Sequence, residues 1–230
     1  MARTKLKKFE KLKKMEHVIQ PLRDELLHDS FMFKGAWSDK FGNNHPIILE
    51  LGCGKGEYTV ALARQNPQFN YIGIDIKGAR IYSGAQEVID YNLKNVIFIR
   101  TQIEYLESIF SKNEIYEIWL TFPDPQIKFN RRKKRLTHPL MLKKYKHILS
   151  ENGVVNLKTD SMFLHGYTLG VLESGSYKII KTMHDLYNTF YVDPRLDIQT
   201  HYEKMFLKKN MPIIINDKQM ILVFFVNMYI

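Results

Sequence analysis

The stretch 47–56, IILELGCGKG, constrains the fold of this chain more than any other. A short apolar run ends next to Glu50, and glycines then alternate with other residues. Residues 57–65 place apolar side chains three and four positions apart, which predicts a helix. The order is strand, tight turn and helix, in which glycine lets a ligand approach the backbone and the first helical N–H groups favour a polar or anionic group. The glycines are Gly52, Gly54 and Gly56.

The spacing of these glycines helps to identify the ligand. Dinucleotide-binding proteins use G-x-G-x-x-G, whereas this chain has G-x-G-x-G with Glu57 in the position of the third glycine. A carboxylate two residues before the first glycine suits a ligand with a cationic amino-acid end better than a pyrophosphate. We therefore predict an S-adenosylmethionine site that includes Glu50, Gly52 and Gly54. The alternative is an ordinary strand–helix turn.

A second acidic residue supports the nucleoside interpretation. The predicted strand 70–75 ends at Asp75, close to the roughly 20-residue offset at which a carboxylate meets ribose hydroxyls. Asp75 alone could instead cap the helix predicted for 77–91. The two stretches together favour a nucleoside-binding site.

From residue 47 onward the pattern alternates between strands and helices. This alternation predicts a Rossmann-like α/β fold, with a mostly parallel sheet covered by helices on both faces. Two further strands near the C-terminus fit the seven-stranded sheet of class I S-adenosylmethionine-dependent methyltransferases. We expect a basic N-terminal arm and lead-in over 1–44 and a methyltransferase domain over 45–230. The predicted strands are 47–51, 70–75, 95–100, 115–121, 153–158, 176–182 and 219–229; the predicted helices are 57–66, 77–91, 138–149 and 160–173.

Composition narrows the class of protein and its partners. A length of 230 residues with 45% hydrophobic content fits one α/β domain with an appendage. The net charge of +10 favours a polyanionic partner. Cys53 is the single cysteine, which excludes an internal disulfide and disfavours a thiolate metal site. The longest apolar run, 221–226, is too short to cross a bilayer and the N-terminus has no apolar signal segment, so we expect a soluble, cytoplasmic protein.

The first 20 residues are rich in lysine. Leu6, Phe9, Leu12 and Met15 fall three apart, which allows a loose helix. The segment is either a solvated or disordered tail, or a basic arm that lies along a nucleic-acid backbone. Residues 21–46 look irregular, and we expect Trp37 and nearby aromatic residues to pack this lead-in onto the domain.

Polar side chains follow each predicted strand, and in open α/β sheets ligands bind outside the carboxyl ends of the strands. Pro123 and Pro125 flank Asp124, which stiffens its loop and aims the carboxylate. Lys128 and the basic run 131–135 come next. We interpret this run as a phosphate grip, although a solvated face would give the same pattern. The residues expected on this rim are Glu50, Asp75, Gln102, Asp124 and Asp160.

From about residue 45 to its end the sequence resembles the bacterial tRNA (guanine-N(7)-)-methyltransferases. The proline-flanked Asp124 and the T-x-Y-E motif are the specific marks, whereas the glycine motif identifies only the superfamily. The matching segments are 50–56 (ELGCGKG), 73–76 (GIDI), 122–125 (FPDP) with Lys128, 157–160 (LKTD) and 200–203 (THYE).

This resemblance implies roles for individual residues. Asp124 would be the catalytic residue, and it would line the S-adenosylmethionine site together with Glu50, Asp75 and Gln102. The substrate would be tRNA, and the target a guanosine in its variable loop. The residues implied to contact the tRNA are Lys128, Asp160 and the segment 200–203, with Thr200 and Glu203 at its ends.

The chain departs from the family at three places. Gln126 stands where the family has Trp, Asn130-Arg131 where it has Arg-His, and Gln102 where it has Asp. A Gln side chain still offers an acceptor to the adenine amino group. Other interpretations remain open on the RNA side, because Asp160 could merely cap a helix, and Thr200 with Glu203 could form a capping box.

The implied chemistry needs no general base, because guanine N(7) carries a lone pair and no proton. It needs alignment and negative potential near the growing positive charge, which Asp124 can supply. Asp160 and Glu203 can accept hydrogen bonds from the guanine N–H edge. His138 with Pro139 suggests a helix start, the other histidines show no metal-ligand spacing, and we expect no metal. The alternatives are a methyltransferase of the same fold acting on another RNA or a small molecule, and an RNA-binding module with a vestigial pocket.

Overall fold

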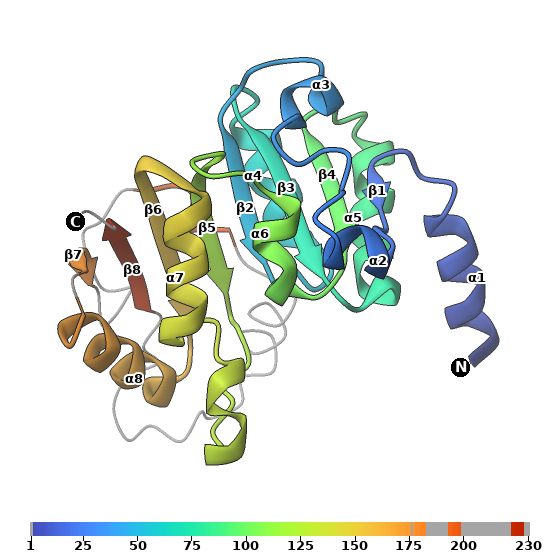
Figure 1. The fold of residues 1–230 in the computed structure, drawn as a ribbon. Coiled ribbons are helices and arrows are strands. Elements are labelled where there is room, and N and C mark those ends of the chain that lie inside the picture. The colour runs from blue at the N-terminus through green and yellow to red at the C-terminus, as the bar shows by residue number, and fades with distance from the viewer. Residues whose placement is uncertain (1, 176, 183–192, 199–221, 228–230) are drawn as a thin grey trace.

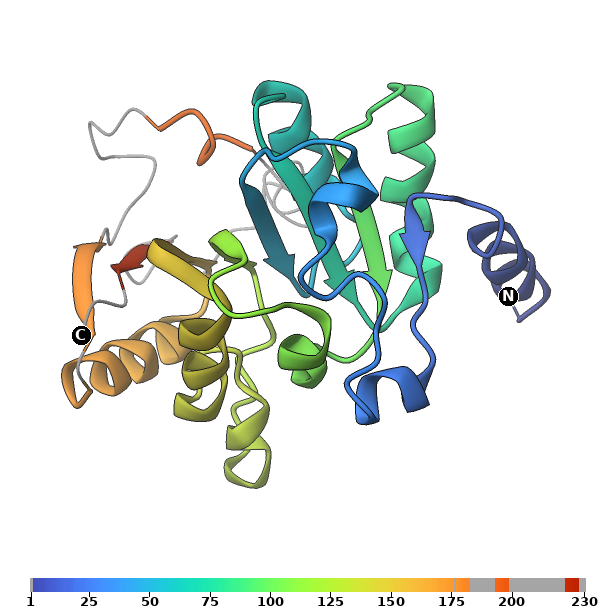
Figure 2. The same cartoon turned by 45° about the horizontal axis from the view of Figure 1, so that its top comes forward.

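The computed structural model describes residues 2–175, 177–182, 193–198 and 222–227. They form one sheet with helices on both faces (Figures 1 and 2), as the alternating pattern predicts. The strands are β1 (Val18–Ile19), β2 (Ile47–Leu51), β3 (Asn70–Asp75), β4 (Val96–Arg100), β5 (Ile115–Thr121), β6 (Leu149–Thr159), β7 (Lys178–Thr182) and β8 (Leu222–Asn227). The helices are α1 (Ala2–Leu12), α2 (Arg23–Leu27), α3 (Trp37–Phe41), α4 (Glu57–Gln65), α5 (Gly78–Asp90), α6 (Leu106–Ile109), α7 (Pro139–Ile148) and α8 (Met162–Glu173), with 3-10 helices η1 (Ile103–Tyr105) and η2 (Phe129–Lys134).

The strand order is β1-β4-β3-β2-β5-β6-β8-β7. Neighbours from β1 to β6 are parallel, and β8 runs antiparallel to both β6 and β7. The described residues thus form an eight-stranded sheet, and the expected count of seven is wrong because the lead-in adds β1 beside β4. A two-residue strand is too short to carry a periodic signal. The carboxyl ends of the central parallel strands share one edge, at the bottom of Figure 1.

Two hydrophobic cores lie on opposite faces of the sheet, because successive strand residues point to opposite sides. Leu49 and Ile72 belong to the core under α6, α7 and α8. Ile48 and Tyr71 belong to the core that α1, α4 and α5 cover. Burial on both faces explains why the central strands read as continuous apolar runs rather than as alternating patterns.

The lead-in before β2 packs on the first of these cores. Trp37 is buried, its ring lies near Phe31, Phe33 and Phe110, and its Nε1 donates to the Ile109 carbonyl at 3.2 Å. This confirms the predicted packing. The expectation of an irregular lead-in is wrong for the short helices α2 and α3, whose five residues each are too few to show a helical period.

The basic N-terminal segment forms α1, which packs on α5. Leu12 is fully buried, and the Arg100 guanidinium lies 4.4 Å from the centre of the Phe9 ring. Lys7, Lys13 and Lys14 remain exposed. A disordered tail therefore does not describe residues 2–12, and contact with nucleic acid stays a prediction.

Predicted and observed boundaries differ most at β6, which begins at Leu149 rather than at residue 153. The additional residues at the start of the strand include Ser150 and Glu151, whose polar side chains interrupt the hydrophobic pattern. His138 is the N-cap of α7, as expected, and its Nδ1 accepts from the Leu140 N–H at 3.2 Å. In the parts of the chain that the structure describes, no helix is long and apolar enough to span a membrane.

Candidate active site

The glycine turn between β2 and α4 contains two kinds of glycine. Gly52, Gly54 and Gly56 all have positive φ, at 76°, 57° and 77°. A Cβ on Gly56 would lie 2.5 Å from the Phe98 ring, so this glycine is needed for packing. A Cβ on Gly52 or Gly54 would meet nothing closer than 3.8 Å. The first two glycines therefore border open space at the carboxyl edge, where a ligand can approach the backbone.

Glu50 supports this turn through hydrogen bonds to its flanking elements. Its side chain is 3% exposed; Oε2 accepts from the N–H and the hydroxyl of Thr59, and Oε1 accepts from the Thr121 hydroxyl at 2.5 Å. Burial raises the pKa of this carboxyl to about 7, against hydrogen bonds from the two threonines that lower it. Glu50 thus ties β2 to α4 and β5, and contact with a cofactor stays a prediction.

Asp75 joins the same turn from the neighbouring strand. It is 9% exposed; Oδ2 accepts from the Gly54 N–H at 3.0 Å and Oδ1 from the Lys77 N–H at 2.7 Å. Lys77, and not Asp75, is the N-cap residue of α5, so the capping alternative is wrong. The carboxylate instead holds the glycine turn against the end of β3.

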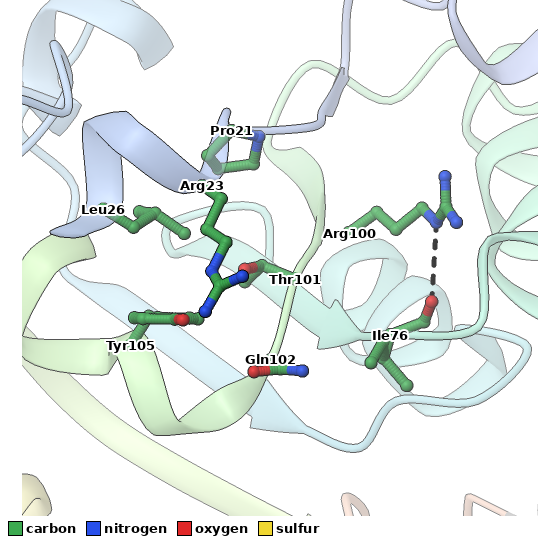
Figure 3. A pocket seen from close by; sticks show the side chains of 8 residues that line it. All are labelled: Pro21, Arg23, Leu26, Ile76, Arg100, Thr101, Gln102 and Tyr105. Carbon is green, nitrogen blue, oxygen red and sulfur yellow. Dashed lines mark hydrogen bonds between the residues drawn. The ribbon is translucent and has the colours of Figure 1, made fainter.

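Gln102 follows β4 and lines a pocket of about 380 Å³. Figure 3 shows its side chain between Ile76 on one side and Arg23 and Tyr105 on the other. Arg23 comes from α2, so the lead-in forms one wall of this pocket. The sequence does not reveal that wall, because Arg23 and Gln102 lie far apart along the chain.

The Asp124 loop is held in an unusual backbone conformation. Phe122 and Gln126, on either side of it, both have φ of 46° without being glycine. Such residues cost about 1 kcal/mol or more each and persist only where the surroundings enforce them. The Phe122 N–H donates to the Lys158 carbonyl at 2.7 Å, and the Gln126 N–H donates to Asp124 Oδ1 at 2.9 Å. The loop therefore presents an exposed Asp124 in a defined position.

Arg135 supports this loop from within. It is buried, and it donates through Nε to the Pro125 carbonyl and through Nη2 to the Gln126 carbonyl, both at 3.2 Å. Its guanidinium lies 4.7 Å and 4.3 Å from the ring centres of Phe163 and Tyr167 on α8. The interpretation of 131–135 as a phosphate grip is thus wrong for Arg135. Exposed positive charge remains on Lys128, Arg131, Lys133 and Lys134.

Lys158 fastens a distant segment to the sheet. It is fully buried, and its Nζ donates to the carbonyls of Leu196 and Ile198 at 2.9 Å and 3.0 Å. The same Nζ lies 5.5 Å from the centre of the Phe122 ring, so it also contacts the start of the Asp124 loop. Tyr58 adds a hydrogen bond from its hydroxyl to the Arg195 carbonyl at 2.7 Å. Segment 193–198 is therefore fixed next to the loop.

Asp160 is exposed directly after β6. Ser161, rather than Asp160, caps α8, because the Ser161 hydroxyl accepts from the Leu164 N–H at 3.2 Å. The capping alternative for Asp160 is therefore wrong. Thr200 and Glu203, the remaining predicted substrate contacts, lie outside the described residues.

The strand order brings the predicted site residues to one rim. Strands β4, β3, β2, β5 and β6 are consecutive and parallel, so the residues at their carboxyl ends lie in that order along the edge. In strand order these residues are Gln102, Asp75, Glu50, Asp124 and Asp160.

Comparison with known proteins identifies the family. A family model described as "Putative methyltransferase" matches residues 44–215. The tRNA (guanine-N(7)-)-methyltransferase of Christiangramia forsetii is 52% identical over 214 residues, which cover 92% of this chain and 96% of that protein. The protein of the same name from Bacteroides thetaiotaomicron is 42% identical, with 93% and 84% covered. This chain belongs to the tRNA (guanine-N(7)-)-methyltransferase family.

Solved structures with the same fold are much more distant in sequence. The 16S rRNA methyltransferase KamB has a TM-score of 0.60 at 13% identity, covering 84% of this chain and 92% of that one. An antibiotic-related methyltransferase has a TM-score of 0.58 at 16% identity, with 85% and 94% covered. These likenesses show the class I methyltransferase fold.

The rim of this family member fits S-adenosylmethionine. The space beside Gly52 and Gly54 accepts a ligand chain that a Cβ would obstruct, and Asp75 lies at the end of the adjacent strand. Exposed Ile76 offers an apolar surface beside the Gln102 pocket, as an adenine ring requires. Gln102 supplies an acceptor within that pocket. Among the described residues, no group of three or more His, Cys, Asp or Glu side chains could hold a metal ion.

Sequence reasoning missed the supporting residues of this tRNA (guanine-N(7)-)-methyltransferase. Arg195 donates to Glu117 at 2.9 Å and to Asp193 at 2.8 Å, which anchors the segment that Lys158 holds. The available signal was Lys158 itself, a lysine within the apolar strand 153–158. Nothing in the sequence separates Arg135 from its exposed basic neighbours.

Proposed function

We propose that this enzyme transfers the methyl group of S-adenosylmethionine to N(7) of a guanosine in the variable loop of tRNA. The observation that carries the proposal is the exposed Asp124, held on a pinned loop one strand away from the open glycine turn. Membership of the tRNA (guanine-N(7)-)-methyltransferase family supports the substrate and the target atom. We further expect the reaction to take place in the cytoplasm.

Binding and alignment account for the chemistry required of the protein. When bound, S-adenosylmethionine supplies an electrophilic methyl group on a sulfonium. Guanine N(7) is an unprotonated nucleophile, so no side chain has to remove a proton. Asp124 places a fixed negative charge where positive charge grows on the guanine ring, and a preorganised charge of this kind stabilises a transition state without reorganising. Phe122 and Gln126, whose backbones are left-handed, and Arg135 together hold the Asp124 loop in place.

A second set of residues recognises the tRNA. Asp160 and Glu203 accept hydrogen bonds from the N–H edge of guanine, a donor pattern that the other bases do not match. Lys128 and the exposed cations of η2 contact phosphates on either side of the target nucleotide. Thr200 completes the substrate contacts implied by the family.

The decisive experiment is methyl transfer from labelled S-adenosylmethionine to bulk tRNA, followed by nucleoside analysis. We expect 7-methylguanosine as the labelled product. Cleavage of the RNA at the 7-methylguanosine should place the mark in the variable loop. Ribosomal RNA serves as the competing substrate, and preferential labelling of it, or a mark elsewhere in tRNA, would contradict the proposal.

A further inference from the structure

An aromatic residue stands exposed within the basic surface next to Asp124. Phe129 opens η2, and 76% of it is accessible to solvent, more than any other exposed large hydrophobic residue of the described chain. η2 is the yellow-green helix that projects from the carboxyl edge at the bottom of Figure 1. Exposure of a phenyl ring to water is unfavourable, so a partner that covers the Phe129 ring would gain binding free energy.

The ring is held in place rather than left to rotate. The Arg132 guanidinium lies 3.9 Å from the centre of the Phe129 ring, and Nη1 of the same arginine donates to the Phe129 carbonyl at 3.2 Å. The guanidinium covers part of the ring, and the rest faces solvent. A preoriented ring loses little conformational freedom when a second planar group stacks on it.

The surroundings of Phe129 select a polyanion. Lys128, Arg131, Lys133 and Lys134 are exposed around it, and no acidic residue occurs between Asp124 and Glu151. Aromatic rings interleaved with cations are typical of surfaces that bind single-stranded nucleic acid, on which bases stack while the cations contact phosphates.

Phe129 is also mechanically coupled to the candidate catalytic loop. Arg135, at the C-cap of η2, donates to the carbonyls of Pro125 and Gln126, so that η2 and the Asp124 loop form one unit.

We propose that Phe129 is a stacking platform for an unpaired base of the RNA, adjacent to the guanosine that enters the site. The inference rests on the proposed function, because it takes tRNA as the substrate. The occupant is a nucleobase from a single-stranded segment, and base pairing in a duplex would hide the face that has to stack.

The first test compares Phe129→Ala with Tyr91→Ala in the full-length enzyme. Tyr91 is a matched control, since the Arg64 guanidinium also lies 3.9 Å from the centre of its exposed ring, but Tyr91 precedes β4, at the opposite edge of the sheet. Phe129→Ala should raise the KM for tRNA roughly tenfold, within the range measured for one base stacked on an aromatic ring. The affinity for S-adenosylmethionine should not change, and Tyr91→Ala should behave like the wild type.

The second test reads the contact directly through Phe129→Trp. The two native tryptophans, Trp37 and Trp119, are 1% and 0% exposed, so the new indole would be the single exposed one. The variant should keep its affinity for tRNA, and tRNA or a short unstructured RNA should quench its fluorescence more strongly than duplex RNA does. Fluorescence that tRNA leaves unchanged would overturn the stacking role.

The outcomes separate this inference from the proposed function. If the wild type methylates tRNA and Phe129→Ala has an unchanged KM, the stacking role fails alone. If Phe129→Ala changes the oligomeric state of the free enzyme, the ring serves contact between copies and the inference is overturned. If the wild type does not methylate tRNA, the proposed function fails, whereas quenching of Phe129→Trp by single-stranded RNA would still support stacking.

Discussion

Four carboxylates along one rim divide into two pairs that differ in what surrounds them. Glu50 and Asp75 lie in the half of the rim that we propose binds the cofactor, the cofactor half. Both are buried, and every one of their carboxyl oxygens accepts a hydrogen bond from the protein. Asp160 and Asp124, which we propose also borders the cofactor, lie in the half that we propose meets the RNA, the RNA half, and both are exposed. All four lie at or just beyond the carboxyl ends of neighbouring parallel strands, so strand position alone does not explain the difference.

The difference arises from the chain that follows each strand. After β2, the glycine turn brings the Gly54 N–H to the Asp75 carboxylate, and the start of α4 brings the Thr59 N–H to Glu50. After β5, prolines and two left-handed residues turn Asp124 outward. The protein alone therefore satisfies the two carboxylates of the cofactor half, whereas those of the RNA half stay exposed to solvent.

The largest effect should come from Asp124→Asn. Asn keeps the shape and the acceptor for the Gln126 N–H, so the loop stays in place while the charge is lost. We expect turnover to fall by about 10²- to 10³-fold, the scale for loss of one preorganised electrostatic group. Affinity for S-adenosylmethionine should change much less. Single-turnover assays measure the effect, with the exposed and distant Asp29→Asn as control, and a rate near that of the wild type would remove Asp124 from the catalytic role.

At the cofactor half, Glu50 should make stability depend on pH. Its pKa is raised from 4.5 to about 7, so its stabilising contribution is complete below the unfolded value and is lost as the pH rises through about 7. The loss is on the order of 3 kcal/mol. Glu50→Gln cannot ionise, so urea unfolding at pH 5 and pH 8 should show it gaining stability relative to the wild type at the higher pH. A constant difference would contradict the shift.

Lys158→Met tests whether segment 193–198 belongs to the RNA half. Loss of two hydrogen bonds from a charged donor should lower the rate of tRNA methylation by roughly 10- to 100-fold. Affinity for S-adenosylmethionine should stay within about twofold. Tyr58→Phe removes a single hydrogen bond from a neutral donor to the same segment and should lower the free energy of unfolding by about 1 kcal/mol. Equal losses of cofactor binding and turnover would show that Lys158 serves general stability instead.

Gln102 sharpens the boundary of the cofactor half. If its amide oxygen accepts from the adenine amino group, Gln102→Leu should weaken binding of S-adenosylmethionine by roughly 1–3 kcal/mol, because the amino group of the bound adenine loses its acceptor. Gln102→Asp should bind about as well as the wild type. Calorimetry with Glu104→Leu as the exposed control measures this, and full affinity in the Leu variant would exclude Gln102 from the site.

The smallest effect concerns α1. Deleting residues 1–14 would also remove the buried Leu12, so replacing the exposed Lys7, Lys13 and Lys14 with Gln is the cleaner change. Each lost phosphate contact should flatten the slope of log K against log salt for tRNA by roughly 0.7–0.9. Lys94→Gln with Lys112→Gln, at the amino ends of β4 and β5, is the control. An unchanged slope would mean that α1 serves the fold alone.

The residues at the strand ends were predictable because burial on both faces makes the central strands continuous apolar runs that stop abruptly. That sequence pattern alone predicts that Glu50, Asp75, Asp124 and Asp160 lie on one edge of the sheet. The support of the site was not predictable, since it depends on contacts between distant segments. Arg135 is buried between the Asp124 loop, to which it donates hydrogen bonds, and the aromatic side chains of α8.

The same limit applies to the N-terminal region. Arg23 reaches the Gln102 pocket because β1 pairs with β4 and brings the lead-in to the rim. No local pattern in residues 21–46 indicates that pairing. Local periodicity therefore predicts the longer strands and the residues at their ends, and tertiary contacts decide which side chains hold those ends in place.

The position of β8 in the sheet limits the order in which the strands can pair during translation. Residues 222–227 are synthesised after β7, yet they lie between β6 and β7 in the finished sheet. A nascent chain can assemble the parallel strands β2 to β6 early, but β7 lacks its partner strand until residues 222–227 have left the exit tunnel. Completion of the sheet therefore waits until residues 222–227 have been synthesised. A stalled or truncated product would keep the glycine turn and expose the edge of β6, a strand edge open to aggregation.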